Sequence, residues 1–368
     1  MAYKDFIPQN IAPLGTKRID IYDVNNNQVG HIPLGSLTPP PIKQKKYSFG
    51  AVSDIHLCNN DEDYDTSKED FQRALKFFNN EENVNFICVC GDMTVNGCYK
   101  GNEHEFELYR KNVADYSPNT TVYAISGNHD APYNDPKVVT TEADTVGRKD
   151  EELIPYTGRG LYYSFTHGDD VFIMVGEWAW SYHCSFSTPE MQWLYETLEA
   201  NRNKRCFVFQ HLLSFAGSGN PYGAIDGPNK DVTTDILGSG GNTSGKVFLS
   251  LMRHYKNCIW FHGHSHSAFE CQTDNSMANY DQVLGIHSVH IPSLATTRTW
   301  NVETGEYDKH DEGSSQGYVV DVYENGIHLR GRDFENGEFL PIASYWLDTA
   351  LQTIPAGTYT DSTNMIKP

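Results

Sequence analysis

The chain has 368 residues, more than a single hydrophobic core usually supports, so one large α/β domain with small appendages is expected. Its 48 acidic against 28 basic side chains give a formal charge of -20, which repels polyanions and argues against a partner such as a long nucleic acid. The 8 cysteines are scattered, unlike a dense disulfide framework, and no apolar run approaches the roughly 18 residues of a membrane span. With no signal-peptide pattern at the N-terminus, these features predict a soluble, cytoplasmic protein without a membrane partner.

The N-terminal segment predicts a small separate module. In residues 17–34, two apolar or alternating runs flank an Asn-rich turn, which is a hairpin signal. The sequence SLTPPPIKQKK follows, and its three prolines favour an extended linker. We therefore expect a β-hairpin module with a Pro-rich linker in residues 1–46, the main domain in 47–345 and a C-terminal tail in 346–368. A protein partner would bind through the N-terminal module.

From Tyr47 onward, strand and helix signals alternate, which predicts a layered α/β domain. Short apolar runs predict strands in YSFGAVSD, VNFICVCGD, TVYAISGNHD, RCFVFQH and NCIWFHGHSH. Hairpins are expected in YYSFTHGDDVFIMVGEW and in GYVVDVYENGIHLRGRDF, the second as an outer antiparallel part. Cys88 and Cys90 alternate within one apolar run, so we expect them to be buried rather than to bind metal.

Two amphipathic helices are expected between these strands. Apolar residues at helical spacing follow Ser67, which forms a variant capping box with Asp70. Thr188 is expected to cap a second helix, with Pro189 in its first turn. The Gly/Ser/Asn-rich stretch 216–245 is too long for an ordinary connection, so it is expected to be a substrate-selecting lid or a surface loop.

Polar blocks stand where five of the predicted strands end. They are Asp54-x-His56, Gly91-Asp92, Gly127-Asn128-His129-Asp130, His211 and Gly263-His264-Ser265-His266. Ligands of α/β sheets bind at the carboxyl ends of strands, and residues two apart on an extended chain point the same way. Each block alone is weak evidence. Together, their carboxylate, imidazole and amide groups predict a site for a divalent ion such as Mn, Fe or Zn.

With these blocks in this order, the chain resembles the calcineurin-like metallophosphoesterases, whose pattern is D-x-H, G-D, G-N-H-D/E, H and G-H-x-H. The resemblance covers roughly residues 47–340. It implies a four-layer α/β/β/α sandwich of two mixed sheets flanked by helices, here with a small N-terminal β-hairpin extension. It also implies an enzyme that hydrolyses phosphoric esters.

The resemblance further implies two divalent metal ions. Two ligand sets with one shared residue follow from it: Asp54, His56, Asp92 and His266 for one ion, and Asp92, Asn128, His211 and His264 for the other. Such a pair of ions clamps the phosphoryl oxygens and turns a bridging water into the attacking hydroxide. His129 would protonate the leaving oxygen or steady charge on the phosphate, because imidazole titrates near neutrality. A purely structural hydrogen bond is its alternative role.

Particular residues disfavour two branches of this family. Purple acid phosphatases need a tyrosine ligand three residues after the G-D aspartate, where this chain has Val95. Protein Ser/Thr phosphatases carry an arginine in G-D-x-V-D-R-G, whereas residues 91–97 read GDMTVNG. The chain is similar to the branch of cyclic-nucleotide phosphodiesterases, which implies a phosphodiesterase for a small substrate such as a nucleotide.

Other readings stay open. A phosphomonoesterase or a nuclease of the same family would use the same residues. A phage or cell-surface attachment protein with an ancillary phosphoesterase domain would explain the N-terminal module, which the enzyme fold does not need. Outside the motifs, we expect His262 to be structural and Arg298 to line the pocket. Trp178 and Trp180 are expected to pack in the core or at its rim, or to stack on a nucleobase.

Overall fold

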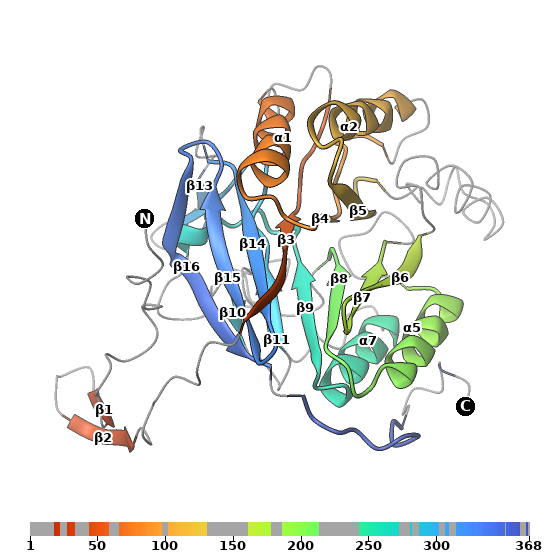
Figure 1. Cartoon of the computed structure of the whole chain (residues 1–368), viewed down its shortest axis with the longest axis vertical. Coiled ribbons are helices and arrows are strands. Elements are labelled where there is room, and N and C mark those ends of the chain that lie inside the picture. The colour runs from red at the N-terminus through yellow and green to blue at the C-terminus, as the bar shows by residue number, and fades with distance from the viewer. Residues whose placement is uncertain are drawn as a thin grey trace.

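A computed structural model provides the fold. It describes residues 18–22, 28–33, 44–58, 66–97, 102–130, 161–177, 186–212, 243–271, 280–281, 287–301, 306–308, 314–349, 351–360 and 366. Most of these residues lie in two six-stranded sheets that pack face to face, with helices on both outer sides (Figure 1). Trp178, Trp180 and most of the 216–245 stretch fall outside the described residues.

The first sheet has the strand order β16-β15-β14-β3-β4-β5. Its strands are β3 (Lys45–Val52), β4 (Phe86–Cys90), β5 (Thr121–Ile125), β14 (Gln316–Tyr323), β15 (Gly326–Asp333) and β16 (Glu338–Asp348). Strands β3, β4 and β5 are parallel, while β14, β15 and β16 form an antiparallel half. The sequence places the later hairpin at the outside of the fold, but β14 pairs with β3 in the middle of the sheet, and the edge strands are β16 and β5.

The second sheet has the strand order β10-β11-β9-β8-β7-β6. Its strands are β6 (Tyr162–His167), β7 (Asp170–Val175), β8 (Cys206–Gln210), β9 (Cys258–His262), β10 (Tyr280–Asp281) and β11 (His287–His290). The central strands are parallel, and the two edge strands run antiparallel to their neighbours. Both sheets are therefore mixed, and each contains a run of adjacent parallel strands, β3-β4-β5 in the first sheet and β11-β9-β8-β7 in the second.

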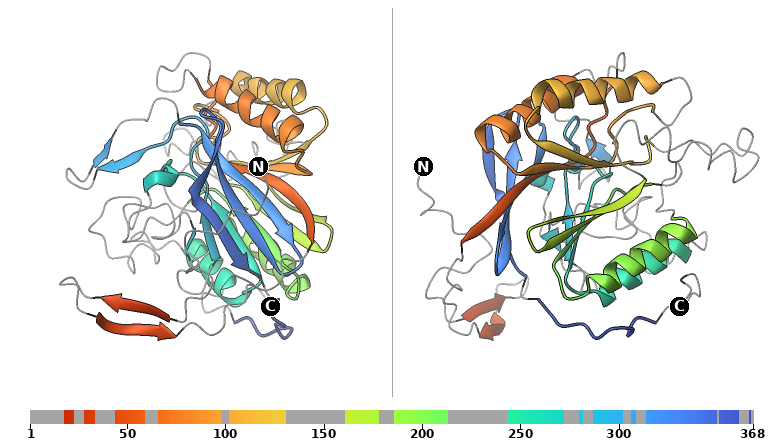
Figure 2. Two further views of the ribbon diagram at one scale, coloured as in Figure 1. Left: turned by 60° about the vertical axis from the view of Figure 1, so that its left-hand side comes forward. Right: turned by 45° about the vertical axis from the view of Figure 1, so that its right-hand side comes forward.

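Helices cover the outer faces of both sheets (Figure 2). Helices α1 (Ser67–Lys76), continued by the π-helical turn Phe77–Glu81, and α2 (Glu103–Tyr116) pack on the first sheet, and α5 (Thr188–Ala200) and α7 (Thr243–His254) on the second. Buried apolar side chains form one cluster between the sheets and one beneath each helix pair. This confirms the predicted four-layer sandwich. No helix among the described ranges is long and apolar enough to cross a membrane.

Smaller elements complete the described structure. Strands β1 (Arg18–Tyr22) and β2 (Gln28–Pro33) pair with each other as the predicted N-terminal hairpin. Strands β12 (Thr299–Asn301) and β13 (Glu306–Asp308) form a second small ribbon, and Phe269–Cys271 forms one 3₁₀ turn. The hairpin is a sheet of its own and joins neither large sheet.

Both predicted helix caps are shifted by one residue. Helix α1 starts at Ser67, and Thr66 precedes it without a side-chain capping bond, so the predicted Ser67–Asp70 capping box is wrong. In α5 the cap is Ser187 rather than Thr188. Its hydroxyl accepts the Glu190 N–H, and the Glu190 carboxylate accepts the Ser187 N–H. A serine one residue before Thr-Pro can turn its side chain back to the third helical residue, which is the geometry of a capping box.

The boundaries expected near residues 46 and 345 both lie inside strands, because β3 begins at Lys45 and β16 ends at Asp348. Beyond β16, residues 351–360 cross the ends of α5 and α7. Ile354 is buried there, and its carbonyl accepts the Nε–H of Arg202 at 3.1 Å. The Asn257 amide donates to the Gln352 carbonyl at 2.7 Å. Part of the expected tail is thus a strap fixed to the second helix layer.

Candidate metal centre

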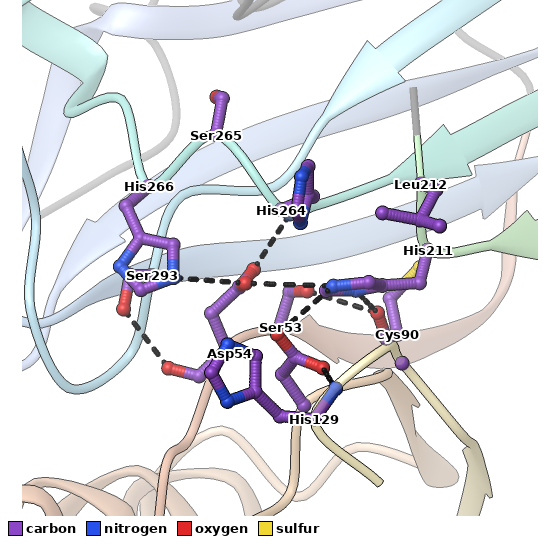
Figure 3. Close-up of polar contacts among 12 residues, drawn as sticks. Ser53, Asp54, Cys90, His129, His211, Leu212, His264, Ser265, His266 and Ser293 are labelled. Atoms are coloured by element: carbon purple, nitrogen blue, oxygen red, sulfur yellow. Dashed lines mark hydrogen bonds and ion pairs between the residues drawn. The ribbon is translucent and has the colours of Figure 1, made fainter. Parts of the chain in front are cut away.

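The candidate ligands stand on five loops that leave the parallel strands at one edge of the two sheets. Figure 3 shows Asp54, His211, His264 and His266 among them. Asp54 and His56 follow β3, Asp92 follows β4, Asn128 follows β5, His211 follows β8, and His264 and His266 follow β9. Parallel strands bring their carboxyl ends to a common edge, and the face-to-face packing of the two sheets brings these two edges together. The loops of the first sheet therefore meet those of the second.

Most of the candidate ligands sit on left-handed backbone. Positive φ angles occur at Asp54, His56, Asp92, His264 and His266. For residues with a Cβ this conformation costs about 1 kcal/mol or more each, so other contacts must hold it. Main-chain bonds between the loops supply them: Asp54 N–H donates to the Gly91 carbonyl, and His56 N–H donates to the Asp92 carbonyl. Such strain in several adjacent loops is typical of a functional site.

Two glycines of the motifs allow these loops to touch. A Cβ on Gly127 would lie 2.1 Å from Oδ1 of Asp92, and a Cβ on Gly263 would lie 1.9 Å from Oγ of Ser53 and 2.5 Å from Oδ2 of Asp54. No side chain fits at such distances. Each glycine therefore lets its strand end approach a carboxylate that belongs to another strand.

Asp54, His56 and His266 form a first group, whose ligand atoms all lie within 4.8 Å of one another. The Nε2 atoms of His56 and His266 are 3.0 Å apart, and Oδ1 of Asp54 is 3.1 Å from Nε2 of His266. Two imidazole nitrogens that each lie about 2.1 Å from one ion at a right angle are about 3.0 Å apart. The arrangement therefore fits a shared cation.

Asp92, His211 and His264 form a second group of the same size. Nε2 of His211 lies 3.1 Å from Oδ2 of Asp92. Asn128 lies at the same loop edge, and neither polar atom of its buried amide has a hydrogen-bond partner among the described residues. Buried amides are nearly always paired, so this amide has the character of a metal ligand.

Asp92 lies between the two groups. Its Oδ2 is 3.7 Å from Nε2 of His56 and 3.1 Å from Nε2 of His211. A ligand atom of His129 also lies within 4.8 Å of those of Asp92 and His56. The structure thus brings six of the seven candidate ligands together at one edge, and the loop that carries Asn128 and His129 contacts Asp92 through the His129 N–H.

Main-chain carbonyls orient three of the histidines. Nδ1 of His211 lies 2.7 Å from the Cys90 carbonyl, and Nδ1 of His266 lies 3.0 Å from the Thr296 carbonyl. A carbonyl only accepts, so each Nδ1 carries the proton and Nε2 is left for a metal ion. Nδ1 of His129 lies 2.7 Å from the Val95 carbonyl, which likewise leaves its Nε2 free to accept or donate a proton.

The buried carboxylates determine where protons sit in the metal-free centre. Burial opposes ionisation of Asp92, yet His211, His129 and His56 hold its pKa well below its usual range. Burial likewise opposes a charge on His211, but Asp92 and Asp54 raise its pKa to about 10. Burial lowers the pKa of His56 to about 4 and that of His264 to about 3. His211 therefore carries the positive charge that a metal ion would replace.

Two buried carboxylates, Asp130 and Glu177, lie beside the centre, and no role was predicted for either of them from the sequence. Asp130, the last residue of the GNHD block, accepts hydrogen bonds from the N–H groups of Met93, Thr94 and Gly127. Burial and then Asp92 raise its pKa to about 7. Glu177 accepts the Gln210 amide at 2.6 Å, next to His211. The motif position could have revealed Asp130, whereas Glu177 stands in no motif.

The remaining residues singled out from the sequence have definite places. Cys88 and Cys90 are buried, as predicted. Nε2 of His262 lies 2.9 Å from Oγ of Ser288 on the neighbouring strand β11. Arg298 is half-buried beside the centre, and its N–H donates to the His266 carbonyl at 2.7 Å.

Comparison with known families matches residues 47–268 to the calcineurin-like phosphoesterase model. The match covers more than half of the chain and contains all seven candidate ligands. The chain therefore belongs to the calcineurin-like phosphoesterase family. Membership implies a metal-dependent hydrolase of phosphoric esters with a dinuclear centre of divalent ions, for which this site has the donor groups. Comparison with curated proteins found no match.

Solved structures share the fold. A dimetal phosphatase from Danio rerio is 13% identical with a TM-score of 0.51, and the alignment covers 83% of this chain and 100% of that one. A purple acid phosphatase from yellow lupin seeds is 14% identical with a TM-score of 0.51, covering 84% of this chain and 55% of the lupin chain. At these identities the likeness establishes the fold alone.

Proposed function

We propose that this protein is a phosphodiesterase that hydrolyses a small phosphoric diester, such as a nucleotide, at the dinuclear centre. One observation carries the proposal: Asp92 lies between two groups of ligand atoms, and His129 stands beside them, next to Asn128 on the loop after β5. Manganese, iron and zinc are the ions proposed for this set of imidazoles, carboxylates and one amide. Asp54, His56, Asp92 and His266 would hold one ion, and Asp92, Asn128, His211 and His264 the other.

The ions, when bound, polarise the phosphoryl oxygens and lower the pKa of water. The chain itself supplies proton transfer to the leaving group. His129 is held by the hydrogen bond from Nδ1 to the Val95 carbonyl, so its Nε2 is the nitrogen that can carry a proton to the leaving oxygen. His129 is thus the proposed general acid.

The charge around the centre favours a diester over a monoester. A phosphomonoester carries nearly two negative charges at neutral pH, whereas a diester carries one. Asn96 stands where protein Ser/Thr phosphatases have an arginine, and its N–H donates to the Glu105 carboxylate at 2.7 Å. Arg298 beside His266 supplies a cation. The Arg298 cation, in a chain of formal charge -20, suits a singly charged ester better than a doubly charged one.

A substrate panel tests this proposal. Metal-reconstituted protein is assayed on cyclic nucleotides, bis-aryl phosphodiesters, nucleotide pyrophosphates and phosphomonoesters, with Asp92→Ala as the inactive control. We expect kcat/KM to be highest on a diester and lost in the control. A higher kcat/KM on monoesters would contradict the diester preference, and rapid cleavage of single-stranded DNA would favour a nuclease.

The separate β1–β2 hairpin supports a second candidate function, attachment to another protein, for example in a phage particle or at a cell surface. The hairpin pairs with neither large sheet, so the hydrolase fold does not require it. Deletion of residues 1–43, which leaves β3 intact, should leave kcat/KM unchanged and abolish association with the partner. A deletion variant that loses hydrolysis while it stays folded would show that the hairpin belongs to the enzyme.

A further inference from the structure

Behind the G-H-S-H turn lies a buried polar cluster that the metal centre does not use. His290 ends β11, and its neighbour in the parallel register is His262 at the end of β9. His290 is 0% exposed, and its Nε2 lies 2.9 Å from Oγ of Ser265. The strand that carries His290 thus contacts the residue between the two candidate ligands His264 and His266.

Ser265 points away from the metal centre. Figure 3 shows the rings of His264 and His266 on the side of Asp54 and the Ser265 side chain on the opposite side of the turn. The pattern G-H-x-H does not specify the residue at this position. Because it is nearly buried, Ser265 can join the turn to the sheet behind it.

The hydrogen bonds of Ser265 determine which atom of His290 donates. Oγ of Ser265 donates to Oγ of Ser267 at 3.1 Å and accepts the Ser267 N–H at 3.3 Å. Its single proton is thereby used, so Nε2–H of His290 donates to Ser265. Nδ1 of His290 is then a buried acceptor without a partner in the described ranges, which costs less than a buried unpaired N–H. Burial lowers the pKa of His290 to about 3, so the ring is neutral at pH 7.

The turn needs such an anchor. His264 and His266 have φ angles of 73° and 57°, so both ligands sit on strained backbone on either side of Ser265. Relaxation of either residue would move its imidazole away from its ion, and metal ligands tolerate errors of only about 0.5 Å. The end of β11 is rigid, since the N–H of Ile291 continues the ladder to the His262 carbonyl at 2.7 Å.

We propose that His290 is a positioning residue of the metal centre: through its buried hydrogen bond to Ser265 it holds His264 and His266 in the geometry that binds the two ions. The inference rests on the metal centre of the proposed function, but not on any substrate. Residues that hold metal ligands in place typically contribute 10- to 100-fold to metal affinity.

Metal affinity tests this role directly. Mn²⁺ is titrated by calorimetry into full-length protein that has been stripped with a chelator. We expect His290→Leu to weaken Mn²⁺ binding by about tenfold, and Ser265→Ala by at least as much, since Ser265→Ala also removes the bonds to Ser267. The double variant should bind no more weakly than Ser265→Ala, because both changes remove the bond between His290 and Ser265. His290→Gln should restore most of the affinity, since its amide N–H can donate to Ser265.

Ser288→Ala is the matched control. It removes the partner of His262 on the adjacent strand without touching the turn, so it should bind Mn²⁺ like the wild type. Thermal unfolding of each stripped variant separates loss of metal affinity from loss of the fold. If His290→Leu does not fold, the smaller change Ser265→Ala decides.

Unchanged Mn²⁺ affinity in folded Ser265→Ala, or losses that add in the double variant, would overturn the inference. The outcome for the proposed function is separate. A wild-type protein that binds Mn²⁺ in a His290-dependent way but hydrolyses no phosphoric ester would contradict that function and leave the role of His290 intact.

Discussion

At the scale of single residues, His129 and Val95 show how a main-chain carbonyl can orient a proposed catalytic histidine. Protein Ser/Thr phosphatases have a carboxylate at the position of Val95. In this chain the Val95 main-chain carbonyl accepts Nδ1–H of His129 at 2.7 Å. A carbonyl fixes the tautomer of the His129 ring without adding a charge. The ring is therefore oriented by a neutral group, the Val95 carbonyl, where a carboxylate would be charged.

Removal of the His129 imidazole should therefore affect esters unequally. A diester with an alkyl leaving group needs a proton on the departing oxygen, whereas an activated aryl leaving group does not. We expect His129→Ala to lower kcat/KM by about 10²- to 10⁴-fold on alkyl diesters and much less on aryl diesters. Metal content should stay at the wild-type level. Equal slowing on both esters would rule out the general-acid role.

The individual ligands could be predicted from the sequence to different degrees. Asp54, His56, His264 and His266 stand in paired motifs, and the structure brings them together. The prediction of His211 as a ligand depended only on its position after an apolar run. His290 could not be predicted, because no motif or spacing joins it to Ser265, 25 residues earlier in the chain. Only the parallel pairing of β9 and β11 makes them neighbours.

At the scale of elements, short apolar runs predicted the strands well, because a strand buried on both faces leaves little choice of residue. The predicted helix caps were wrong by one residue. In α5, Ser187 and Thr188 are both good capping residues, and the angle at which the chain enters the helix makes Ser187 the cap. The strap beyond β16 carries no periodic pattern. Its structure depends on tertiary contacts alone, so the sequence predicted a tail.

Gly263 tests the close approach of β9 to the loop after β3. We expect Gly263→Ala to abolish tight Mn²⁺ binding, because its Cβ would overlap Oγ of Ser53 and crowd Oδ2 of Asp54. The control is Gly168→Ala, where the nearest atom would be 4.0 Å away and the φ of +59° costs only about 1 kcal/mol. Calorimetric titration of both variants measures the difference. Wild-type affinity in Gly263→Ala would show that the loops have room to move.

The strap predicts a loss of stability without a loss of function. Ile354 is 7% exposed and packs beneath α5 and α7, so Ile354→Ala should lower the free energy of unfolding by about 2 kcal/mol. Leu351, which is 56% exposed, is the matched control. Leu351→Ala should change the free energy of unfolding by less than about 0.5 kcal/mol. Urea unfolding measures both. Equal effects would mean that the strap is not packed as described.

At the scale of the whole molecule, the alternation of strand and helix signals predicted a layered α/β domain, and the resemblance to the calcineurin-like family supplied the four-layer arrangement. Sheet order was not predictable, because the return of β14 to pair with β3 joins segments about 270 residues apart. That pairing places the antiparallel half beside the parallel strands and leaves the carboxyl ends of β3, β4 and β5 open to the metal centre. The fold thus builds the site from both ends of the main domain.

The protons of the centre predict how the stability of the metal-free protein depends on pH. Burial lowers the pKa of His56 to about 4 and of His264 to about 3, below the ordinary 6.5. The unfolded chain therefore binds more protons in this window, so stability is full above 6.5 and falls as the pH drops toward 3. The contribution of His211 to stability depends on pH in the opposite direction. Its pKa is about 10, so this contribution is full below pH 6.5 and is lost as the pH rises through 10.

Urea unfolding of chelator-stripped protein across this range should therefore give a maximum near neutral pH. His211→Ala should remove the alkaline decline and leave the acid one. A flat profile for the wild type would contradict the assigned protonation states.

Metal content together with hydrolysis tests the central claim most directly. Purified protein is analysed for bound metals, then assayed on a bis-aryl phosphodiester before chelation, after chelation and after addition of Mn²⁺. The dinuclear centre predicts about two divalent ions per chain, activity that disappears on chelation and returns with Mn²⁺, and neither in Asp92→Ala. Hydrolysis that persists undiminished in the chelated protein and in Asp92→Ala would contradict it.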